Sequence, residues 1–272
     1  VIETGAGEAS HFSDNEYSEA GAQIAYTTKE VYEADLILKV EPISVEEMEH
    51  LKPKQVLISA MQLNVHPKDY IKNLMKKKVT AIAWDYIADE DGILPIVRSM
   101  GEIAGTTSIL IAAEYLSNSK GQGIMLGGIT GVAPTQVAII GAGTVGEFAA
   151  RAAIGLGADV RVFDNSISKL RRLQNSIGQR VSTSTIQPKV LSKALMRADV
   201  VIGAIRSIAG RTPCYVSDEM VRNMKPSSVI VDVSIDQGGC FETSRITTHD
   251  KPTFTVHDVI HYCVPNIASR AS

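Results

Sequence analysis

The sequence predicts an α/β protein of two domains, one of them built on a doubly wound parallel sheet. Three observations support this fold class. Short apolar runs alternate with helical patterns over most of the 272 residues. A glycine-rich turn, Gly141-Ala-Gly-Thr-Val-Gly146, directly follows the apolar run 137–140, and a further apolar run, 159–163, ends in Asp164. Strands that alternate with helices in this way indicate parallel strands joined by crossover helices.

Residues 1–95 are expected to form the first domain. Their largely apolar runs predict buried parallel strands at 34–40, 55–60 and 79–84, and residues 1–4 look like a further strand. Helical patterns separate these runs: Ser44-Val-Glu-Glu47 is a capping box, and another helix is expected to begin near Pro67. The chain begins at Val1 inside an expected strand and ends without an evident closing element, so we expect this domain to be incomplete at both chain ends.

Residues 96–272 are expected to form the second domain. A helix at about 101–116 joins it to the first, and a glycine-rich loop at 121–131 leads into the strand that begins at Val137. After that strand the alternation continues, and Ser217 is a good helix cap. The other expected elements are helices at 168–176 and 189–198, a strand at 199–205, a segment 225–235 that ends in a strand pointing at Asp236, and a last strand and turn at 254–261.

The glycine spacing predicts a dinucleotide site. Gly141 permits a tight turn, Gly143 lets the backbone approach a pyrophosphate, and Gly146 lets the helix pack closely on the strand. The helix opens at Thr144 and Val145, where free N–H groups and the positive end of the helix dipole face the phosphates. A lone glycine triplet is weak evidence. Here it stands inside a complete strand–turn–helix–strand unit, which indicates a Rossmann-type domain.

Asp164 favours NAD as the dinucleotide. It lies about 20 residues after the glycine turn, where a carboxylate accepts hydrogen bonds from the adenosine ribose and repels the 2′-phosphate of NADP. Open parallel sheets bind ligands at the carboxyl ends of their strands. The glycine turn, Asp164, the turn 205–207 and Asp236 all fall at such ends, so we expect them to converge on one nucleotide site.

Composition narrows the classes of partner. The net charge of -3 and the pI of about 6.1 offer no basic footprint for a nucleic acid. No apolar stretch reaches transmembrane length. Cys214, Cys240 and Cys263 lack metal-binding spacing, and an odd count without a signal sequence fits a reducing compartment. We therefore expect a cytoplasmic protein with no metal, nucleic-acid or membrane partner.

Several phrases resemble the alanine dehydrogenase family, which is related to the NAD-binding component of the proton-translocating transhydrogenases. Besides the glycine turn, these phrases are Glu3-Thr-Gly-Ala-Gly-Glu8, Gly127-Gly-Ile-Thr-Gly-Val-Ala-Pro134, Ala198-Asp-Val-Val-Ile-Gly-Ala204, Asp236-Gln-Gly-Gly239 and His261-Tyr-Cys-Val-Pro-Asn266. The resemblance implies a substrate domain that both chain ends wrap, which makes 1–95 the substrate domain, an NAD domain in 96–272 and a cleft between the two domains. It also implies a homo-oligomer, either a hexamer or a dimer.

The resemblance further implies reversible, NAD-dependent oxidative deamination of L-alanine, or of a similar small amino acid, to pyruvate or the matching 2-oxo acid and ammonia. Asp236 is the expected acid–base residue, with Lys39 and Gln62 at the substrate. The expected cofactor contacts are Gly141, Gly143, Thr144, Val145 and Gly146 at the phosphates, Asp164 and Lys169 at the ribose, Ile205 and Arg206 along the cofactor, and Asp236, Val264 and Asn266 at the nicotinamide end.

The sequence departs from the family pattern at two substrate positions. Where the family reads Lys-Val-Lys-Glu-Pro, this chain reads Lys39-Val-Glu-Pro42. A gapless register places Glu41 at the functional lysine, and a one-residue gap lets Lys39 approximate its place. Gln62 stands at the position of the family's histidine, and glutamine forms hydrogen bonds but does not titrate. The segment that carries the family's carboxylate-binding arginine is absent from this chain.

These departures leave two alternatives open. One is a non-deaminating NAD(H)-binding subunit or sensor of the transhydrogenase type, and the other is a saccharopine-type dehydrogenase. His66 precedes a proline and is a weak candidate for a displaced catalytic histidine. The remaining histidines and cysteines near the nicotinamide end are interpreted as packing residues; they are His257, His261, Cys240 and Cys263.

Overall fold

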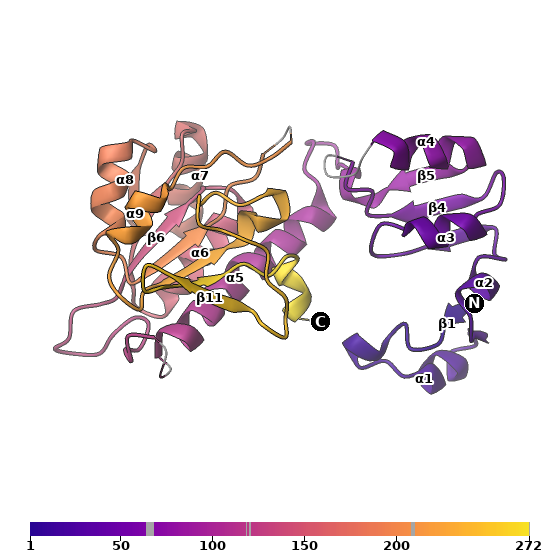
Figure 1. Cartoon of the computed structure of the whole chain (residues 1–272), viewed down its shortest axis with the longest axis horizontal. Coiled ribbons are helices and arrows are strands. Elements are labelled where there is room, and N and C mark those ends of the chain that lie inside the picture. The colour runs from indigo at the N-terminus through magenta and orange to yellow at the C-terminus, as the bar shows by residue number, and fades with distance from the viewer. Residues whose placement is uncertain (64–67, 118, 120, 208–209, 272) are drawn as a thin grey trace. The chain divides into compact units, whose positions relative to one another are not determined.

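The computed structural model describes residues 1–63, 68–117, 119, 121–207 and 210–271. The chain forms two compact units, Val1–Val97 and Arg98–Ala271, and each has its own hydrophobic core (Figure 1). The expected helix start at His66 and Pro67 lies outside the described residues. Over the described ranges, no helix combines the length and the apolar character that crossing a membrane requires.

The first unit contains a parallel three-stranded sheet in the order β3–β4–β5. Helices connect these strands, and α3 and α4 lie beside them in Figure 1. The elements are β3 (Leu36–Leu38), α3 (Val45–His50), β4 (Val56–Ser59), α4 (Lys68–Lys77), β5 (Thr80–Ala83) and the 3₁₀ helix η2 (Trp84–Tyr86). Ser44 and Glu47 form the predicted capping box at the start of α3. Ile37 and Leu57 pack with Met48, Tyr70 and Leu74 to form the core of this unit.

The start of the first unit is a parallel pair of short strands with small helices around it. These elements are β1 (Ile2–Glu3), η1 (Glu8–Ser10), α1 (Asp14–Glu19), β2 (Ile24–Ala25) and α2 (Thr28–Val31). Burial in the neighbouring sheet differs from the prediction for run 34–40. Ile37 is 4% exposed, but Leu36 and Leu38 are 50% and 73% exposed. The expectation of a fully buried strand was therefore wrong for β3, because successive side chains point to opposite faces and only one face of β3 is covered. It was also wrong for β5, in which Thr80, Ala81 and Ile82 are exposed.

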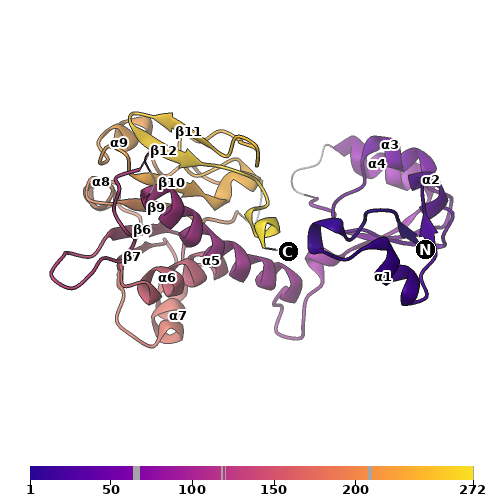
Figure 2. The same ribbon diagram turned by 90° about the horizontal axis from the view of Figure 1, so that it is seen from below.

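The second unit is the predicted doubly wound sheet. Its strand order is β11–β12–β10–β9–β6–β7–β8, and every neighbouring pair is parallel except β11–β12. In Figure 2 the strand labels run from bottom to top in the same order as the sheet: β7, β6, β9, β10, β12 and β11. The strands are β6 (Gln136–Ile140), β7 (Asp159–Phe163), β8 (Ser182–Ser184), β9 (Val200–Gly203), β10 (Val229–Asp232), β11 (Thr253–Val256) and β12 (Val259–Tyr262). Without β11, this order is that of a Rossmann fold.

Helices cover both faces of this sheet. Val137 and Ile139 of β6 pack with residues of α5 and α6, whereas Ala138 and Ile140 pack with residues of α8 and α9. The apolar run is therefore buried on both sides, as a central parallel strand requires. The helical elements are α5 (Pro95–Ser117), α6 (Thr144–Gly155), α7 (Ile167–Ile177), α8 (Pro188–Leu195), α9 (Asp218–Arg222), η3 (Val233–Gln237) and η4 (Ile267–Arg270).

Four elements differ from the sequence-based expectation. The strand expected to end at residue 235 ends at Asp232, and residues 233–237 form the 3₁₀ helix η3, so Asp236 lies in that helix. Helix α5 begins at Pro95, not near residue 101, because proline is well suited to the first turn of a helix. The polar edge strand β8 was not predicted, since Ser182–Ser184 lacks an apolar pattern. The expected single strand at 254–261 is a hairpin of β11 and β12. His257 and Asp258 turn it with φ of 51° and 60°, the left-handed pair of a tight hairpin turn.

Candidate functional site

The glycine turn packs tightly against its own fold at two positions and leaves a third open. Gly141 has φ of +117°, and a Cβ there would lie 2.3 Å from the carbonyl oxygen of Ala204. A Cβ on Gly146 would lie 1.9 Å from the carbonyl oxygen of Gly141. In contrast, a Cβ on Gly143 would meet nothing within 4 Å. Packing therefore explains the first and third glycines, whereas the space before Gly143 fits a ligand that approaches the backbone closely.

Helix α6 supplies donors at the same place. Gly143 is its N-cap, and no side chain caps this helix start. Thr144 and Val145 occupy the first turn, where α-helical N–H groups lack partners within the helix. This turn, next to the open space before Gly143, fits the pyrophosphate of a dinucleotide.

Asp164 closes the turn from the end of β7. Its side chain is 6% exposed, and its two oxygens accept hydrogen bonds from the backbone N–H of Ala142 at 2.8 Å and of Ser166 at 2.7 Å. A carboxylate offers about four lone-pair positions, so two bonds leave capacity for ribose hydroxyls. Lys169 is exposed in the first turn of α7. The structure therefore gives Asp164 a loop-shaping role that the sequence did not reveal.

Arg172 holds this loop from outside it, and sequence reasoning missed it. Its guanidinium donates a 3.1 Å hydrogen bond to the carbonyl oxygen of Ala142, in the middle of the glycine turn. The arginine comes from α7, one helical turn after Lys169. The sequence did offer one signal for Arg172: it lies three residues after Lys169, so both side chains project from the same face of the helix.

Hydrogen bonds hold the turn at 205–207 to the segment 234–237, which follows β10. The N–H of Ile205 donates to Oγ of Ser234 at 2.9 Å. The N–H of Ser207 donates to Oε1 of Gln237 at 2.8 Å, and Nε2 of Gln237 donates back to the carbonyl oxygen of Ser207 at 3.2 Å. Arg206 lies between these anchors and is exposed. The ends of β9 and β10 are thereby joined, and Gln237 and Ser234 are further residues that the sequence did not single out.

Asp236 and Asn266 meet at the same edge of the sheet. The N–H of Asn266 donates a 2.8 Å hydrogen bond to Oδ1 of Asp236. Desolvation by the surrounding protein raises the pKa of the Asp236 carboxyl above its ordinary value, and the bond from Asn266 opposes that rise. Val264, two residues before Asn266, is 3% exposed and belongs to the hydrophobic core. Its cofactor contact stays a prediction.

In the first unit, Lys39 and Gln62 follow neighbouring parallel strands. Lys39 comes directly after β3, and its Nζ forms an ion pair with Glu47 of α3 at 2.5 Å. Trp84 donates from its indole N–H to the carbonyl oxygen of Lys39 at 3.3 Å. Glu41, the residue that the gapless register places at the functional lysine, is exposed. The lysine is thus present at the strand end, and its charge is already matched by a carboxylate.

Gln62 stands in a strained turn after β4. Its φ is +43°, and its N–H donates to Oδ2 of Asp85 at 3.0 Å. The other oxygen of Asp85 accepts from the N–H of Met61 at 2.9 Å. Asp85 lies in η2, directly after β5, so it fixes the backbone of Gln62 from the adjacent strand. This positioning carboxylate was not predicted, because its role depends on a pairing between distant segments.

The histidines and cysteines near the nicotinamide end are buried or held by polar partners. His261 is 0% exposed, with its ring nitrogens 2.8 Å from Thr243 Oγ1 and 3.0 Å from the carbonyl oxygen of Val259. Burial lowers the pKa of His261 to about 4. His257 pairs with Asp218 at 2.8 Å. Burial also raises the pKa of the Cys240 and Cys263 thiols, in the latter to about 12. His66 lies outside the described residues.

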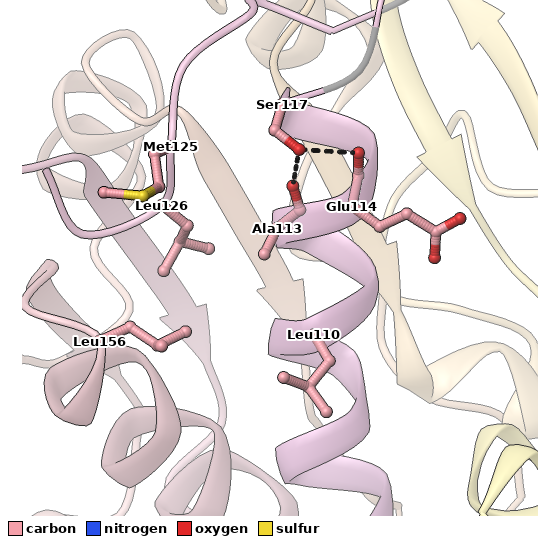
Figure 3. Close-up of a pocket in the computed structure, with 7 residues that line it drawn as sticks. All are labelled: Leu110, Ala113, Glu114, Ser117, Met125, Leu126 and Leu156. Carbon is pink, nitrogen blue, oxygen red and sulfur yellow. Dashed lines mark hydrogen bonds between the residues drawn. The ribbon is translucent and has the colours of Figure 1, made fainter.

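A surface hollow of about 490 Å³ lies away from these groups, between α5 and the loops that hold Met125 and Leu156 (Figure 3). Its lining is mainly aliphatic, and Ser117 within it already donates to the carbonyl oxygens of Ala113 and Glu114. None of the candidate site residues lines it. In the part of the chain that the structure describes, no group of three or more acidic, cysteine or histidine side chains is placed to bind a metal ion.

Comparison with known proteins adds independent evidence. Residues 1–104 match the family described as alanine dehydrogenase/PNT, N-terminal domain, and residues 108–272 match alanine dehydrogenase/PNT, C-terminal domain. The alanine dehydrogenase of Mycolicibacterium smegmatis is 43% identical over 269 residues, which is 98% of this chain and 72% of that protein.

Solved structures give the same answer. An L-alanine dehydrogenase superposes with a TM-score of 0.89 at 36% identity, over 99% of this chain and 77% of that one. A transhydrogenase from Sinorhizobium meliloti superposes with a TM-score of 0.83 at 25% identity, over 99% of this chain and 78% of that one.

Proposed function

This chain belongs to the alanine dehydrogenase/PNT family, and from that premise we propose that it is an NAD-dependent alanine dehydrogenase. The expected reaction is the reversible oxidative deamination of L-alanine to pyruvate and ammonia. One observation carries the proposal beyond family membership. The glycine turn, Asp164, the turn at 205–207 and Asp236 all lie at the carboxyl ends of strands in one sheet, where an open parallel sheet binds its ligand.

The cofactor is NAD, which supplies the hydride acceptor when it is bound. The residues present fit it. Gly143 leaves room for a close approach, and the first turn of α6 supplies N–H donors for phosphate oxygens. Asp164 retains acceptor capacity for the adenosine ribose. We propose Lys169, Ile205, Arg206, Val264 and Asn266 as further contacts, on their positions in the sequence pattern.

We propose Asp236 as the acid–base group. Deamination requires a base for the water that adds to the imine carbon and an acid for the departing ammonia. A carboxylate whose pKa lies above its ordinary value performs both roles better than one at that value. The N–H of Asn266 holds one oxygen of Asp236, which leaves the other for the proton.

On the substrate side we propose Lys39 and Gln62 as contacts, and residues 1–95 as the substrate domain. Lys39 suits this role because it is a cation at the end of a strand, although it already forms an ion pair with Glu47. Gln62 supports it as a polar side chain on a backbone that Asp85 fixes. Because glutamine does not titrate, it orients substrate without moving a proton. Proton transfer therefore rests on Asp236.

The test is an NADH-fluorescence rate assay of the purified protein with pyruvate and ammonium, run beside a Gln62→His variant. Turnover by the parent is the expected result. If only the variant turns over, the natural substrate is a different one. Intact NADH binding with no turnover by either protein would instead favour a nucleotide-binding role of the transhydrogenase type. The similarity to the Sinorhizobium meliloti transhydrogenase is the reason to consider this role.

Assembly and location are further proposals. We propose a homo-oligomer, a hexamer or a dimer, on the family resemblance, and light scattering of the purified protein measures its mass. We also propose a cytoplasmic location. It is supported by the free thiols of Cys214, Cys240 and Cys263, which suit a reducing compartment.

A further inference from the structure

A buried carboxylate outside the expected reaction holds together the loop that carries Asp236. Asp232 is the last residue of β10 and the N-cap of η3, and it is 1% exposed. Its Oδ1 accepts from the N–H of Ser234 at 3.0 Å, and its Oδ2 accepts from the N–H of Cys240 at 3.1 Å and from the hydroxyl of Ser244 at 2.6 Å. These donors lie on both sides of Asp236 in the sequence. One carboxylate therefore holds together the segment before Asp236, at Ser234, and the segment after it, at Cys240 and Ser244. We call this arrangement the clamp.

The clamp occupies space that glycines leave free. A Cβ on Gly203, at the end of β9, would lie 2.6 Å from Oδ1 of Asp232. A Cβ on Gly239, in the turn after Asp236, would lie 2.7 Å from Oδ2. With contacts this short, a side chain at either position would push the buried carboxylate of Asp232 out of place. The carboxylate is thus wedged between a neighbouring strand end and the turn that it holds.

The clamp also reaches the turn at 205–207. Ser234 donates its backbone N–H to Asp232, and its Oγ accepts a hydrogen bond from the N–H of Ile205. The carbonyl oxygen of Ser234 accepts from the N–H of Gly239 at 3.0 Å. Asp232 therefore connects three parts of the candidate site. They are the end of β9 with Ile205, the start of η3 with Ser234, and the turn that follows Asp236.

We propose that Asp232 is a positioning residue, which sets the backbone of Asp236 and of the 205–207 turn at the nicotinamide end of the site. This inference rests on the proposed function of Asp236. Asp232 does not touch the reacting atoms. It acts through Ser234, Cys240 and Ser244, and its effect depends on having acceptors on both oxygens.

Asp232→Asn is the sharpest test, because it keeps the size of the side chain and replaces one acceptor oxygen with a donor amide. That amide faces N–H donors, so the clamp opens. We expect kcat to fall by about 10²-fold, the order of loss that a 1 Å misplacement of a catalytic group produces. We also expect NADH binding to weaken while binding of ADP-ribose, which lacks the nicotinamide, is unchanged. The pH midpoint of kcat should move, since the surroundings of Asp236 change.

Two further variants keep the test decisive. Ser244→Ala removes one bond to the clamp and should produce the same pattern to a smaller degree, even if Asp232→Asn does not fold. Asp159→Asn changes an exposed carboxylate at the start of β7 and should alter none of these readouts. Equal losses of NADH and ADP-ribose affinity, or kcat unchanged in both clamp variants, would overturn the inference. A parent without turnover speaks against the proposed function instead, and the comparison of NADH with ADP-ribose still decides the role of Asp232.

Discussion

The backbone N–H of Asn266 donates a 2.8 Å hydrogen bond to Oδ1 of Asp236, so two residues expected at the nicotinamide end are joined directly. The bond connects η3, which follows β10, to η4, which follows the adjacent parallel strand β12. Asn266 adopts a left-handed backbone, with φ of 52° and ψ of 48°. The chain thus brings segments 30 residues apart to a single carboxylate.

Asp236→Asn should remove the proton transfer and keep the hydrogen bond from Asn266, because the amide oxygen still accepts. We expect kcat for alanine oxidation to fall by about 10²–10⁴-fold, the usual loss for a general acid–base group. NADH affinity should change little. Stopped-flow absorbance at saturating substrate and NADH titration measure the two quantities. A variant that retains the parental rate would remove Asp236 from the mechanism.

The parent should also show a pH dependence that reflects Asp236. Desolvation raises the pKa of this carboxyl, so its basic form is lost at a higher pH than for an ordinary aspartate. The rate of alanine oxidation should therefore decline on acidification with a midpoint above the ordinary value for aspartate. That decline should be absent from the residual rate of Asp236→Asn. A midpoint that is the same in both proteins would assign the titration to another group.

Asp164→Ala should weaken NAD binding by about 1–3 kcal/mol, the usual loss for a charge-assisted hydrogen bond. The N–H groups of Ala142 and Ser166 lose their acceptor in this variant, so the glycine turn also loses its anchor. Calorimetric titration with NADH and with ADP-ribose checks the prediction, and both ligands should weaken equally because both contain the adenosine ribose. Unchanged affinity would discredit the assignment of this residue.

Gly143→Ala and Gly146→Ala form a matched pair that separates ligand space from packing. The added methyl at 143 meets nothing within 4 Å, and φ there is -76°, so the fold should remain stable while NADH binding weakens. The methyl at 146 meets the carbonyl oxygen of Gly141, so this variant should lose about 1–3 kcal/mol of unfolding free energy, as overpacked sites do. Thermal unfolding and NADH titration of both proteins give the answer. Similar stability losses in the two variants would contradict it.

Asp232 and His261 should give the free energy of unfolding two opposite pH dependences. Burial raises the pKa of Asp232 from 3.8 to about 6, so the folded state binds its proton more tightly than the unfolded state does. The stability that this gives is fully present below pH 3.8 and is lost as the pH rises through about 6. For His261, burial lowers the pKa from 6.5 to about 4, so its stability is present above pH 6.5 and is lost as the pH falls through about 4.

Each contribution is of the order of 3 kcal/mol, and in the parent the two largely cancel between pH 4 and 6.5. Removing one group should reveal the other. Asp232→Asn should become more stable as the pH rises through this window, whereas His261→Gln should become less stable. Urea unfolding at four or five pH values measures both slopes. Slopes of the same sign in the two variants would show that one of the two pKa shifts is assigned in the wrong direction.

The second unit was largely predictable from its sequence. The run at 137–140 reads as a strand buried on both faces because every residue is apolar, and the structure buries both of its faces. The glycine spacing and Asp164 predicted a Rossmann turn, and the strand order agrees. The strand Ser182–Ser184 was missed because its pairing with β7, and not its own side chains, makes it a strand.

The candidate site was predictable only in part. The residues at strand ends could be named, but the groups that hold them could not. Arg172 and Asp85 act on segments 30 and 23 residues away, and Asp232 acts on Cys240, 8 residues further on. Nothing local to these residues indicates the partner. Lys39 was an expected substrate contact, and only the structure revealed its ion pair with Glu47.

The amino-acid sequence was enough to predict the fold class and a dinucleotide site, because apolar periodicity and glycine spacing act over a few residues. The family, and with it Asp236 as a candidate acid–base group, came from the resemblance of short phrases to the alanine dehydrogenase family. Only the tertiary structure decided which side chains shape the site. Asp232, for example, joins β10 to residues 8 and 12 positions further on, and Ser234 joins that clamp to Ile205. Such contacts depend on how buried polar groups find partners once the strands are paired, and burial makes those partners obligatory.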